Sequence, residues 1–145
     1  MSIAGNGYLY RLLAEQHGRL HIVSVPNWRQ DHHHTNPNPT HIFAVPGTYT
    51  VQIQGVFPRI LFNNNGDKDK IRSVDNWGNN EWVTMERAFR GCSNLVISAT
   101  NSPNLSNVTS TDRMFQDATA LVDNGGKMGN WDMSTVTNKK KIHIY

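Results

Sequence analysis

The second half of the chain carries a pattern of polar and apolar residues that occurs twice. The segment MERAFRGCSNL at Met85–Leu95 matches TDRMFQDATAL at Thr111–Leu121 at an offset of 26. A second pair, NLSNVTS at Asn104–Ser110 and DMSTVTN at Asp132–Asn138, matches at an offset of 28. Repeats of this length are typical of solenoids, whose units cannot bury an apolar face alone and therefore stack on one another.

Each copy of the pattern predicts a short helix followed by a short strand. The apolar residues within Val83–Phe89 are spaced for one helical face, and Gly91 follows as a stop. The second copy repeats this spacing, which predicts another short helix over Thr111–Gln116. Leu95–Ile97 then suits a short extended segment. The methionine and phenylalanine side chains of both copies are expected to form the core.

The N-terminal part predicts one helix and several strands. Leucines in Tyr8–Gly18 recur at helical spacing, so we expect a short helix there, followed by a strand in Leu20–Val25. Thr40–Leu61 contains a regular alternation of apolar and polar residues and is expected to form antiparallel β structure. Ile71–Val74 is expected to be the strand that enters the repeats.

The repeat residues resemble those of a known family. The pattern runs Trp-Gly-x-x-x-Trp-x-x-Met-x-x-Ala-Phe-x-Gly-Cys-x-Asn-Leu, then Asn-Leu-Ser-x-Val-Thr, a Met-Phe pair and Trp-Asp-Met-Ser-x-Val-Thr. It is similar to the BspA-like leucine-rich surface proteins of bacteria over about Lys70–Asn138. The resemblance implies a repeat-built, surface-exposed or secreted binding protein without a known catalytic centre. The residues that carry the resemblance are Trp77, Gly78, Trp82, Met85, Ala88, Phe89, Gly91, Cys92, Asn94, Leu95, Met114, Phe115, Trp131, Asp132, Ser134 and Val136.

A second, partial resemblance precedes the repeats. Thr-His-x-Phe-x-x-x-Gly-Thr-Tyr-Thr-Val at Thr40–Val51 is similar to the closing hairpin of polycystic-kidney-disease-type (PKD) β-sandwiches, which often precede the repeats of BspA-like proteins. Those domains usually carry Trp-Gly-Asp-Gly before the hairpin, whereas this chain has Trp-Arg-Gln-Asp at residues 28–31. The repeats also depart from the family at residues 142–143, where Ile-His stands in place of another Met-Phe pair. The array is therefore expected to be truncated or rewritten there.

Together these features predict an α+β, β-rich fold. A small antiparallel PKD-like β module over residues 1–69 is expected to precede about two short solenoid repeats, similar to leucine-rich repeats, over residues 70–145. A chain of 145 residues is long enough for one domain or for two small modules. The 17 asparagines and 11 glycines indicate many turns.

The charge pattern does not favour a nucleic-acid partner. The net charge is +3, and Lys139, Lys140 and Lys141 supply three of the positive charges as a solvated run. The first 25 residues show no signal-peptide pattern, and no segment is apolar enough for a membrane span. The resemblance implies a cell-surface or secreted protein, so either a leader has been lost or this chain remains in the cytoplasm.

A protein or glycan ligand is the expected partner of the repeats. Trp77, Trp82 and Trp131 are the candidate binding residues if the repeat surface exposes them, because aromatic side chains make large contacts at a small entropic cost. Packing between units is the favoured alternative for each tryptophan. A structural role within a longer surface protein is a second possible function.

An enzyme is not expected, because no nucleophile elbow, phosphate loop, dinucleotide fingerprint or metalloprotease motif occurs. A small hydrolase would need two acidic side chains at a glycosidase-like separation across stacked units. The candidate carboxylates are Glu81, Glu86, Asp112, Asp117, Asp123 and Asp132.

No cofactor or metal site is expected. His32, His34 and His41 are weak candidate metal ligands, but a flexible polar loop is the favoured interpretation. The acidic loop after Asn63 lacks the glycine and glutamate that an EF-hand needs at its sixth and twelfth positions. Cys92 is the only cysteine, which excludes an intrachain disulfide, and it is expected to be buried.

The last residues of the sequence predict self-association. Ile142, Ile144 and Tyr145 alternate with Lys141 and His143, which suits an exposed edge strand. We therefore expect a homodimer through the C-terminal repeat and tail. Salt should strengthen this association by screening the lysines, and sedimentation at low and high salt would measure it.

Overall fold

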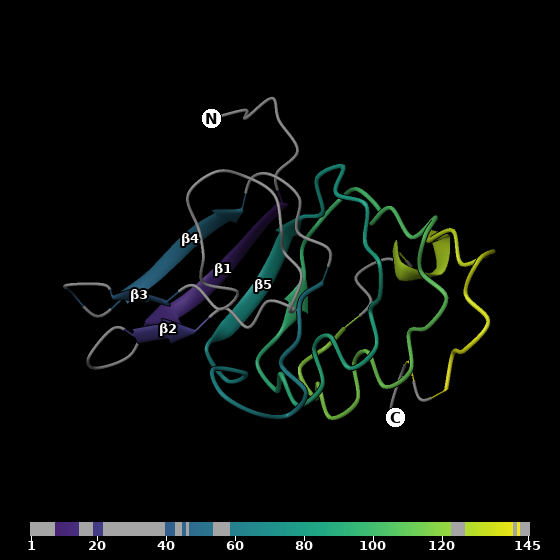
Figure 1. Cartoon of the computed structure of the whole chain (residues 1–145). Helices are drawn as coiled ribbons and strands as arrows, with labels where there is room; N and C mark the ends of the chain where they lie inside the picture. The colour runs from purple at the N-terminus through teal and green to yellow at the C-terminus, as the bar shows by residue number, and fades with distance from the viewer. Residues whose placement is uncertain are drawn as a thin grey trace.

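A four-stranded sheet joins the N-terminal strands to the first strand of the repeats (Figure 1). The computed structural model describes residues 8–14, 19–21, 40–42, 45, 47–53, 59–122, 127–140 and 142. In the sheet, β1 (Tyr8–Ala14) lies between β4 (Gly47–Ile53) and β5 (Ile71–Asn76), and it is antiparallel to both. β6 (Val96–Ile97) pairs with the other edge of β5 and is parallel to it.

The other elements in the described part of the chain are small. β2 (Arg19–His21) and β3 (Thr40–Ile42) form an antiparallel pair, and the 3-10 helix η1 spans Lys127–Asn130. The described residues therefore make a β-rich structure with a small open sheet and almost no helix. None of their helices has the length and apolar character needed to cross a bilayer.

Three of the predicted strands are confirmed. β4 places Thr48 and Thr50 in solvent and half-buries Tyr49. The alternation of apolar and polar residues identifies this strand, because successive side chains of a strand point to opposite faces. β5 buries Ile71 and Val74, and the predicted extended segment Leu95–Ile97 contains β6.

The predicted N-terminal helix is wrong, because Tyr8–Ala14 is the strand β1. Its leucines have a high helix propensity. However, β1 pairs with a strand on each edge: Tyr8 lies opposite Ile53 of β4, and Leu9 lies opposite Asn76 of β5. Tertiary pairing therefore overrides the local preference. The predicted strand that follows is confirmed only in β2, and the residues after His21 lie outside the described part until Thr40.

The hairpin predicted for Thr40–Val51 is also not formed. β3 pairs with β2, whereas β4 pairs with β1 in the other sheet, so the two strands of the expected hairpin have different partners. Among the described residues of Thr40–Leu61, β3 and β4 are the antiparallel strands, and residues 59–61 form no strand. The pairing of β1 with β5 also crosses the predicted module boundary after residue 69.

Both copies of the repeat fold into the same succession of tight turns. The N–H of Ala88 donates to the carbonyl of Met85 at 3.1 Å, and the matching bond from Met114 to Thr111 is 3.0 Å. The predicted helices over Val83–Phe89 and Thr111–Gln116 are therefore wrong. The physical reason is the left-handed φ that recurs in both copies, 54° at Arg87 and at Arg113, because a right-handed helix cannot continue through it.

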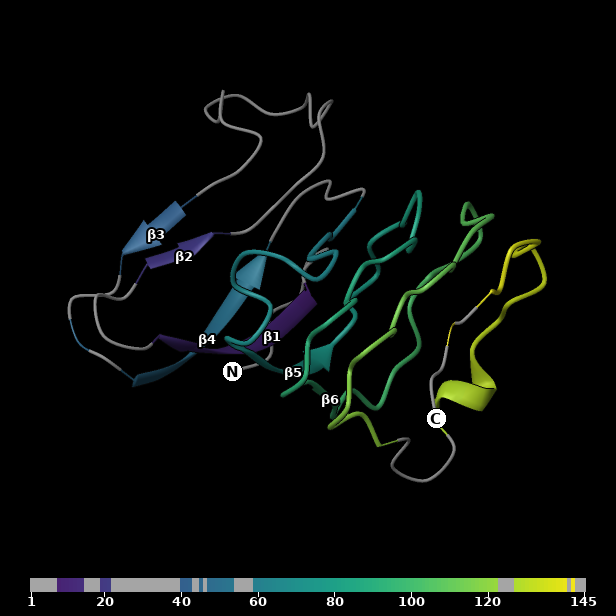
Figure 2. The ribbon, with the colours of Figure 1, turned by 90° about the horizontal axis from the view of Figure 1, so that it is seen from below.

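The copies stack through backbone hydrogen bonds made by alternate residues. The N–H groups of Arg87, Phe89 and Gly91 donate to the carbonyls of residues 112, 114 and 116 at 2.8, 2.8 and 2.7 Å. Arg113 makes the corresponding bond to residue 140 at 2.8 Å, and Phe62 donates to residue 88 at 2.8 Å. Figure 2 shows these segments as side-by-side layers between the sheet and η1. Each layer thus satisfies backbone groups of the next.

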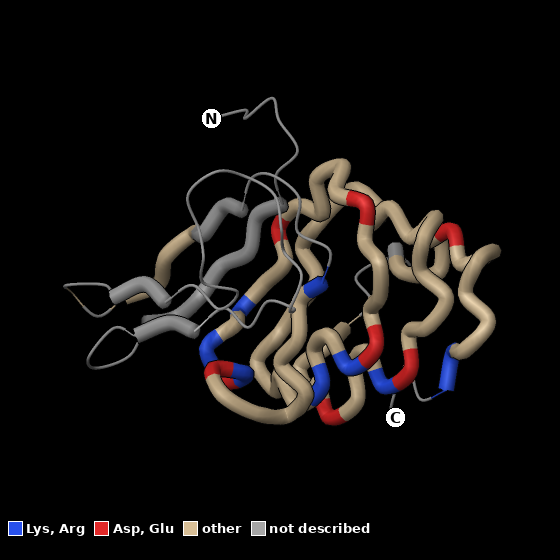
Figure 3. Tube along the Cα trace, viewed as in Figure 1, with Lys and Arg blue, Asp and Glu red and all other residues tan. Residues whose placement is uncertain are grey.

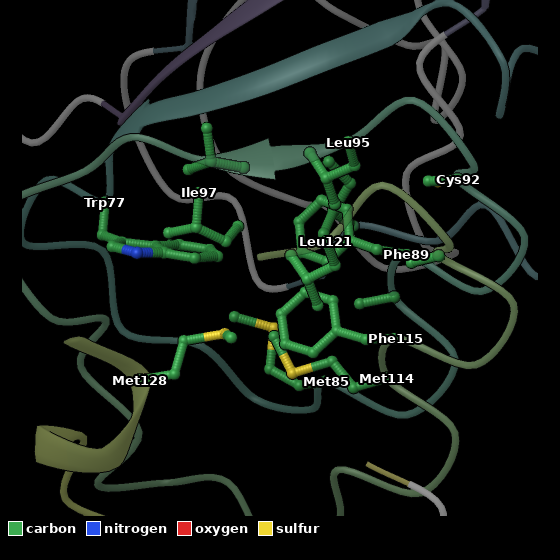
Figure 4. Packing of buried hydrophobic residues seen from close by; sticks show 14 of the residues in the cluster. Trp77, Met85, Phe89, Cys92, Leu95, Ile97, Met114, Phe115, Leu121 and Met128 are labelled. Atoms are coloured by element: carbon green, nitrogen blue, oxygen red, sulfur yellow. The ribbon is translucent and has the colours of Figure 1, made fainter. Parts of the chain in front are cut away.

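Aromatic rings from successive layers fill the core (Figure 4). The Phe89 ring stacks on that of Phe62 with centroids 6.2 Å apart and on that of Phe115 at 5.6 Å. The planes of Phe89 and Phe115 differ by only 9°, which is the result expected of equivalent residues related by a translation. Cys92 is buried in this core, as expected, and burial raises the pKa of its thiol.

Candidate functional site

One edge of the stack is built from three equivalent turns that begin with an amide or a carboxylate side chain. Oδ1 of Asn76, Asn104 and Asp132 accepts a hydrogen bond from the backbone N–H two residues on, at 2.6, 3.1 and 3.0 Å. These three residues are spaced by 28, so the turn occurs once more than the sequence comparison detected. We call residues 76–84, 104–110 and 132–138 the Asx edge.

The Asx edge is polar and contains no lysine or arginine (Figure 3). Asn79, Asn107 and Thr135 occupy the same position of the three turns, and all are exposed. The Thr135 hydroxyl is held in place by hydrogen bonds to the carbonyls of Leu105 and Val108, at 2.9 and 3.0 Å. The edge therefore presents amide and hydroxyl groups at a fixed spacing.

The opposite edge carries charges of both signs (Figure 3). Arg87 lies 3.6 Å from Glu86, and Arg113 lies 3.6 Å from Asp112 at the equivalent place of the next copy. Arg59 donates to the carbonyl of Glu86 at 3.3 Å, and partial burial lowers the pKa of its guanidinium. Partly exposed ion pairs of this kind contribute little to stability. The property that separates this edge from the Asx edge is its arginine side chains.

Of the three residues that begin the equivalent turns, Asp132 is the acidic one, so the stability of its turn is expected to depend on pH. Hydrogen bonds from the hydroxyl and the backbone N–H of Ser134 lower the pKa of Asp132. Because the folded-state pKa is lower than the unfolded-state value of about 4, this stabilisation is complete above that value. It is lost as the pH falls through the folded-state pKa.

We expect NMR titration to give a pKa for Asp132 below the usual range, and Ser134→Ala to raise it. The urea midpoint of the wild type should also fall more than that of Asp132→Asn when the pH is lowered from 5 to 3. Asparagine keeps the acceptor but cannot titrate, so it is the matched variant. Equal acid sensitivity of the two proteins would contradict the prediction.

The three candidate tryptophans are buried rather than displayed. Trp77, Trp82 and Trp131 expose 1, 0 and 7% of their surface. Trp77 makes edge-to-face contacts with both of the others, at centroid distances of 6.2 and 5.3 Å. Their burial leaves none of the three indole rings exposed on the surface of the stack, although Trp131 contributes to the lining of a pocket.

A pocket of about 340 Å³ opens between η1 and the last layer of the stack. Among the described residues that line it, all are apolar except Lys139, which is exposed. We call it the Phe115 pocket, and its lining residues are Phe115, Met128, Gly129, Trp131, Met133, Lys139 and Ile142. No local sequence pattern predicts this pocket, because its described lining comes from three segments that meet only in the fold.

The candidate metal ligands lie mostly beyond the described residues. His32 and His34 are outside them, as is the side chain of His41, whose backbone belongs to β3. Among the described side chains, no three of the histidine, cysteine, aspartate or glutamate type lie close enough to hold a metal ion. In the acidic loop, Asp67 pairs with Lys70 at 2.7 Å and Asp69 with Lys68 at 2.9 Å.

None of the candidate carboxylates in the described part of the chain lines the pocket. Glu86 and Asp112 pair with the neighbouring arginines, and Asp132 is used in its turn. Glu81 and Asp117 are exposed on the surface of the stack, and Asp123 lies outside the described residues.

Comparison with known protein families gives a match, and it covers the repeat region. The family described as "Mycoplasma protein of unknown function, DUF285" matches residues 59–144. The chain belongs to the DUF285 family. The DUF285 match includes both edges and the Phe115 pocket, and it begins before the module boundary predicted after residue 69. No curated protein and no solved structure matches the chain significantly.

Proposed function

We propose that the chain is a non-catalytic interaction module of the BspA-like kind, with its repeats arranged as a short leucine-rich-repeat-like solenoid. The DUF285 family is found in BspA-like surface proteins, which supports this proposal and a location at the cell surface or outside the cell. The layered backbone hydrogen bonds with offsets of 25 to 27 residues are the second support. The PKD-like interpretation of the N-terminal part has no comparable support.

The Asx edge is the proposed contact surface, and the observation that carries this is its exact repetition in three layers. Equivalent exposed residues on neighbouring layers form a row of polar groups. The amides of Asn79 and Asn107 can donate and accept hydrogen bonds, and the Thr135 hydroxyl, whose hydrogen is used inside the turn, can accept them. The turns are internally hydrogen-bonded, so the backbone is ordered before a ligand binds and little conformational entropy is lost. A protein or glycan with regularly spaced polar groups suits such a surface.

Binding of the purified chain to arrays of glycans and of extracellular proteins tests this proposal. Asn79→Lys and Asn107→Lys place long cations on the Asx edge and should weaken any specific binding at least tenfold. Thr119→Lys is the matched control, because Thr119 is an exposed turn residue of the opposite edge. Binding that survives both Asx-edge variants but is lost in Thr119→Lys would contradict the assignment of the edge.

A structural role within a longer surface protein is the second candidate, and the buried tryptophans favour it. If the tryptophans bound a ligand at the repeat surface, their exposed rings would supply most of the contact energy. None of the three tryptophans is exposed. A stack whose outer residues contact no ligand would still act as a rigid spacer. The array experiment separates the two functions, since a spacer gives no binding that depends on the Asx edge.

A further inference from the structure

The Phe115 pocket has the composition of a small-ligand site rather than of a packing defect. Its volume of about 340 Å³ lies at the lower end of the range for ligand pockets. Phe115 and Trp131 contribute aromatic rings whose centroids are 6.1 Å apart, and both residues are almost completely buried. Met128 and Met133 add thioether side chains, which make favourable contacts with aromatic rings.

An aromatic ligand in the pocket would continue the ring-on-ring packing of the core. Phe115 stacks on Phe89 on one side, and Trp131 contacts Trp77 edge to face. Aromatic pairs in offset or edge-to-face geometry contribute more than their buried area alone. A planar ring in the pocket would meet Phe115 and Trp131, so the lining favours an aromatic ligand over an aliphatic chain.

The charge of the pocket lining favours a ligand of the opposite charge. Among the described residues, Lys139 is the one charged residue of the lining, and none of the others forms an ion pair with it. An ammonium group at the rim of an apolar pocket attracts an anion and disfavours a cation. Lys140, the next residue, is equally exposed but does not line the pocket, which makes it a matched comparison.

We propose that the Phe115 pocket binds a small aromatic anion, with the ring against Phe115 and Trp131 and the negative group at Lys139. This inference does not depend on binding at the Asx edge, with which the pocket lining shares only Met133. The pocket volume of about 340 Å³ suits a ligand of up to about three rings.

Two fluorescent probes that differ by one charged group test the proposal. The first is 8-anilinonaphthalene-1-sulfonate, and the second is N-phenyl-1-naphthylamine, which has the same rings without the sulfonate. We expect one saturable site for the sulfonate probe and weaker binding of the neutral probe. Lys139→Gln should weaken binding of the sulfonate probe about five- to tenfold and leave the neutral probe unchanged, whereas Lys140→Gln should change neither.

Two pocket-filling variants, Ile142→Trp and Met133→Trp, show whether the probes bind in this pocket. Both residues are only partly buried, so a larger side chain has room to enter the pocket. We expect either variant to abolish binding of both probes while keeping a wild-type urea midpoint. Non-saturable binding, or unchanged binding in a folded pocket-filling variant, would overturn the proposal.

A second copy of the chain is the competing occupant, and sedimentation without probe distinguishes it. A monomer in the wild type, with or without probe, supports the small ligand. A dimer that becomes monomeric in Ile142→Trp would overturn the proposal and would instead support the self-association predicted from the C-terminal sequence.

Discussion

Replacing Phe89 by alanine is expected to lower the free energy of unfolding by about 3–5 kcal/mol. The ring is 1% exposed and lies between Phe62 and Phe115, so its removal opens a cavity that the layers on both sides line. Backbone hydrogen bonds on both sides of the ring hold the layers at their spacing, which limits collapse of the cavity. Urea denaturation of the wild type and the variant measures the loss.

The same experiment with Phe115→Ala tests whether the two rings act together. Their centroids are 5.6 Å apart, and residues in contact are usually coupled, so the double variant should lose less stability than the sum of the single losses. Val83→Ala is the control, because Val83 is 57% exposed and should change the free energy of unfolding by less than about 0.5 kcal/mol. Additive losses would show that the rings do not share one packing unit.

Gly91→Ala is expected to be the second most damaging change, with a loss of about 2–4 kcal/mol. Gly91 has a φ of +79°, and a Cβ atom there would lie 2.9 Å from the Cα of Asn64 and closer still to the side chain of Asn64. The backbone of Asn64 cannot move away freely, because its N–H donates to the carbonyl of Arg90 at 2.7 Å. The cost therefore comes mainly from steric overlap between layers.

Two other glycines separate steric overlap from backbone strain. Gly66 has a φ of +57° with open space around its Cβ position, so Gly66→Ala measures the strain of a left-handed residue, about 1–2 kcal/mol. Gly129 has open space and no such φ, so Gly129→Ala should be nearly neutral. Urea midpoints of the three variants should follow the order Gly129, Gly66, Gly91 in increasing damage. A Gly91→Ala protein as stable as Gly66→Ala would contradict the overlap.

The sequence predicted the repeat better than it predicted the conformation inside each unit. The offset of 26 identifies the equivalent residues correctly, since the same turns and ring contacts occur in both copies. The turns themselves were predicted as helices, because apolar residues at Met85, Ala88 and Phe89 have helical spacing. The left-handed φ at Arg87 and Arg113 has no signal in the residue type, because arginine rarely adopts it. Hydrogen bonds from the neighbouring layer stabilise it instead.

Long-range contacts explain why the candidate site was predicted less well. The tryptophans are typical contact residues of binding surfaces, but their neighbours in the fold are each other and Phe89, and these contacts bury them. The Asx edge could have been found in the sequence, because Asn76, Asn104 and Asp132 are evenly spaced and each precedes glycine or serine by two residues. The Phe115 pocket had no such local signal.

The order of the strands in the sheet has a consequence for how the protein forms as it is synthesised. β1 and β4 precede β5 along the chain, so they can pair before β5 is made; β5 can then pair with the free edge of β1, and β6 with the free edge of β5. Each new strand meets an edge that already exists, and each later layer of the repeats closes a loop of only about 25 to 27 residues. The chain can therefore add its layers one at a time from the N-terminal side, without holding a large apolar face exposed until synthesis ends.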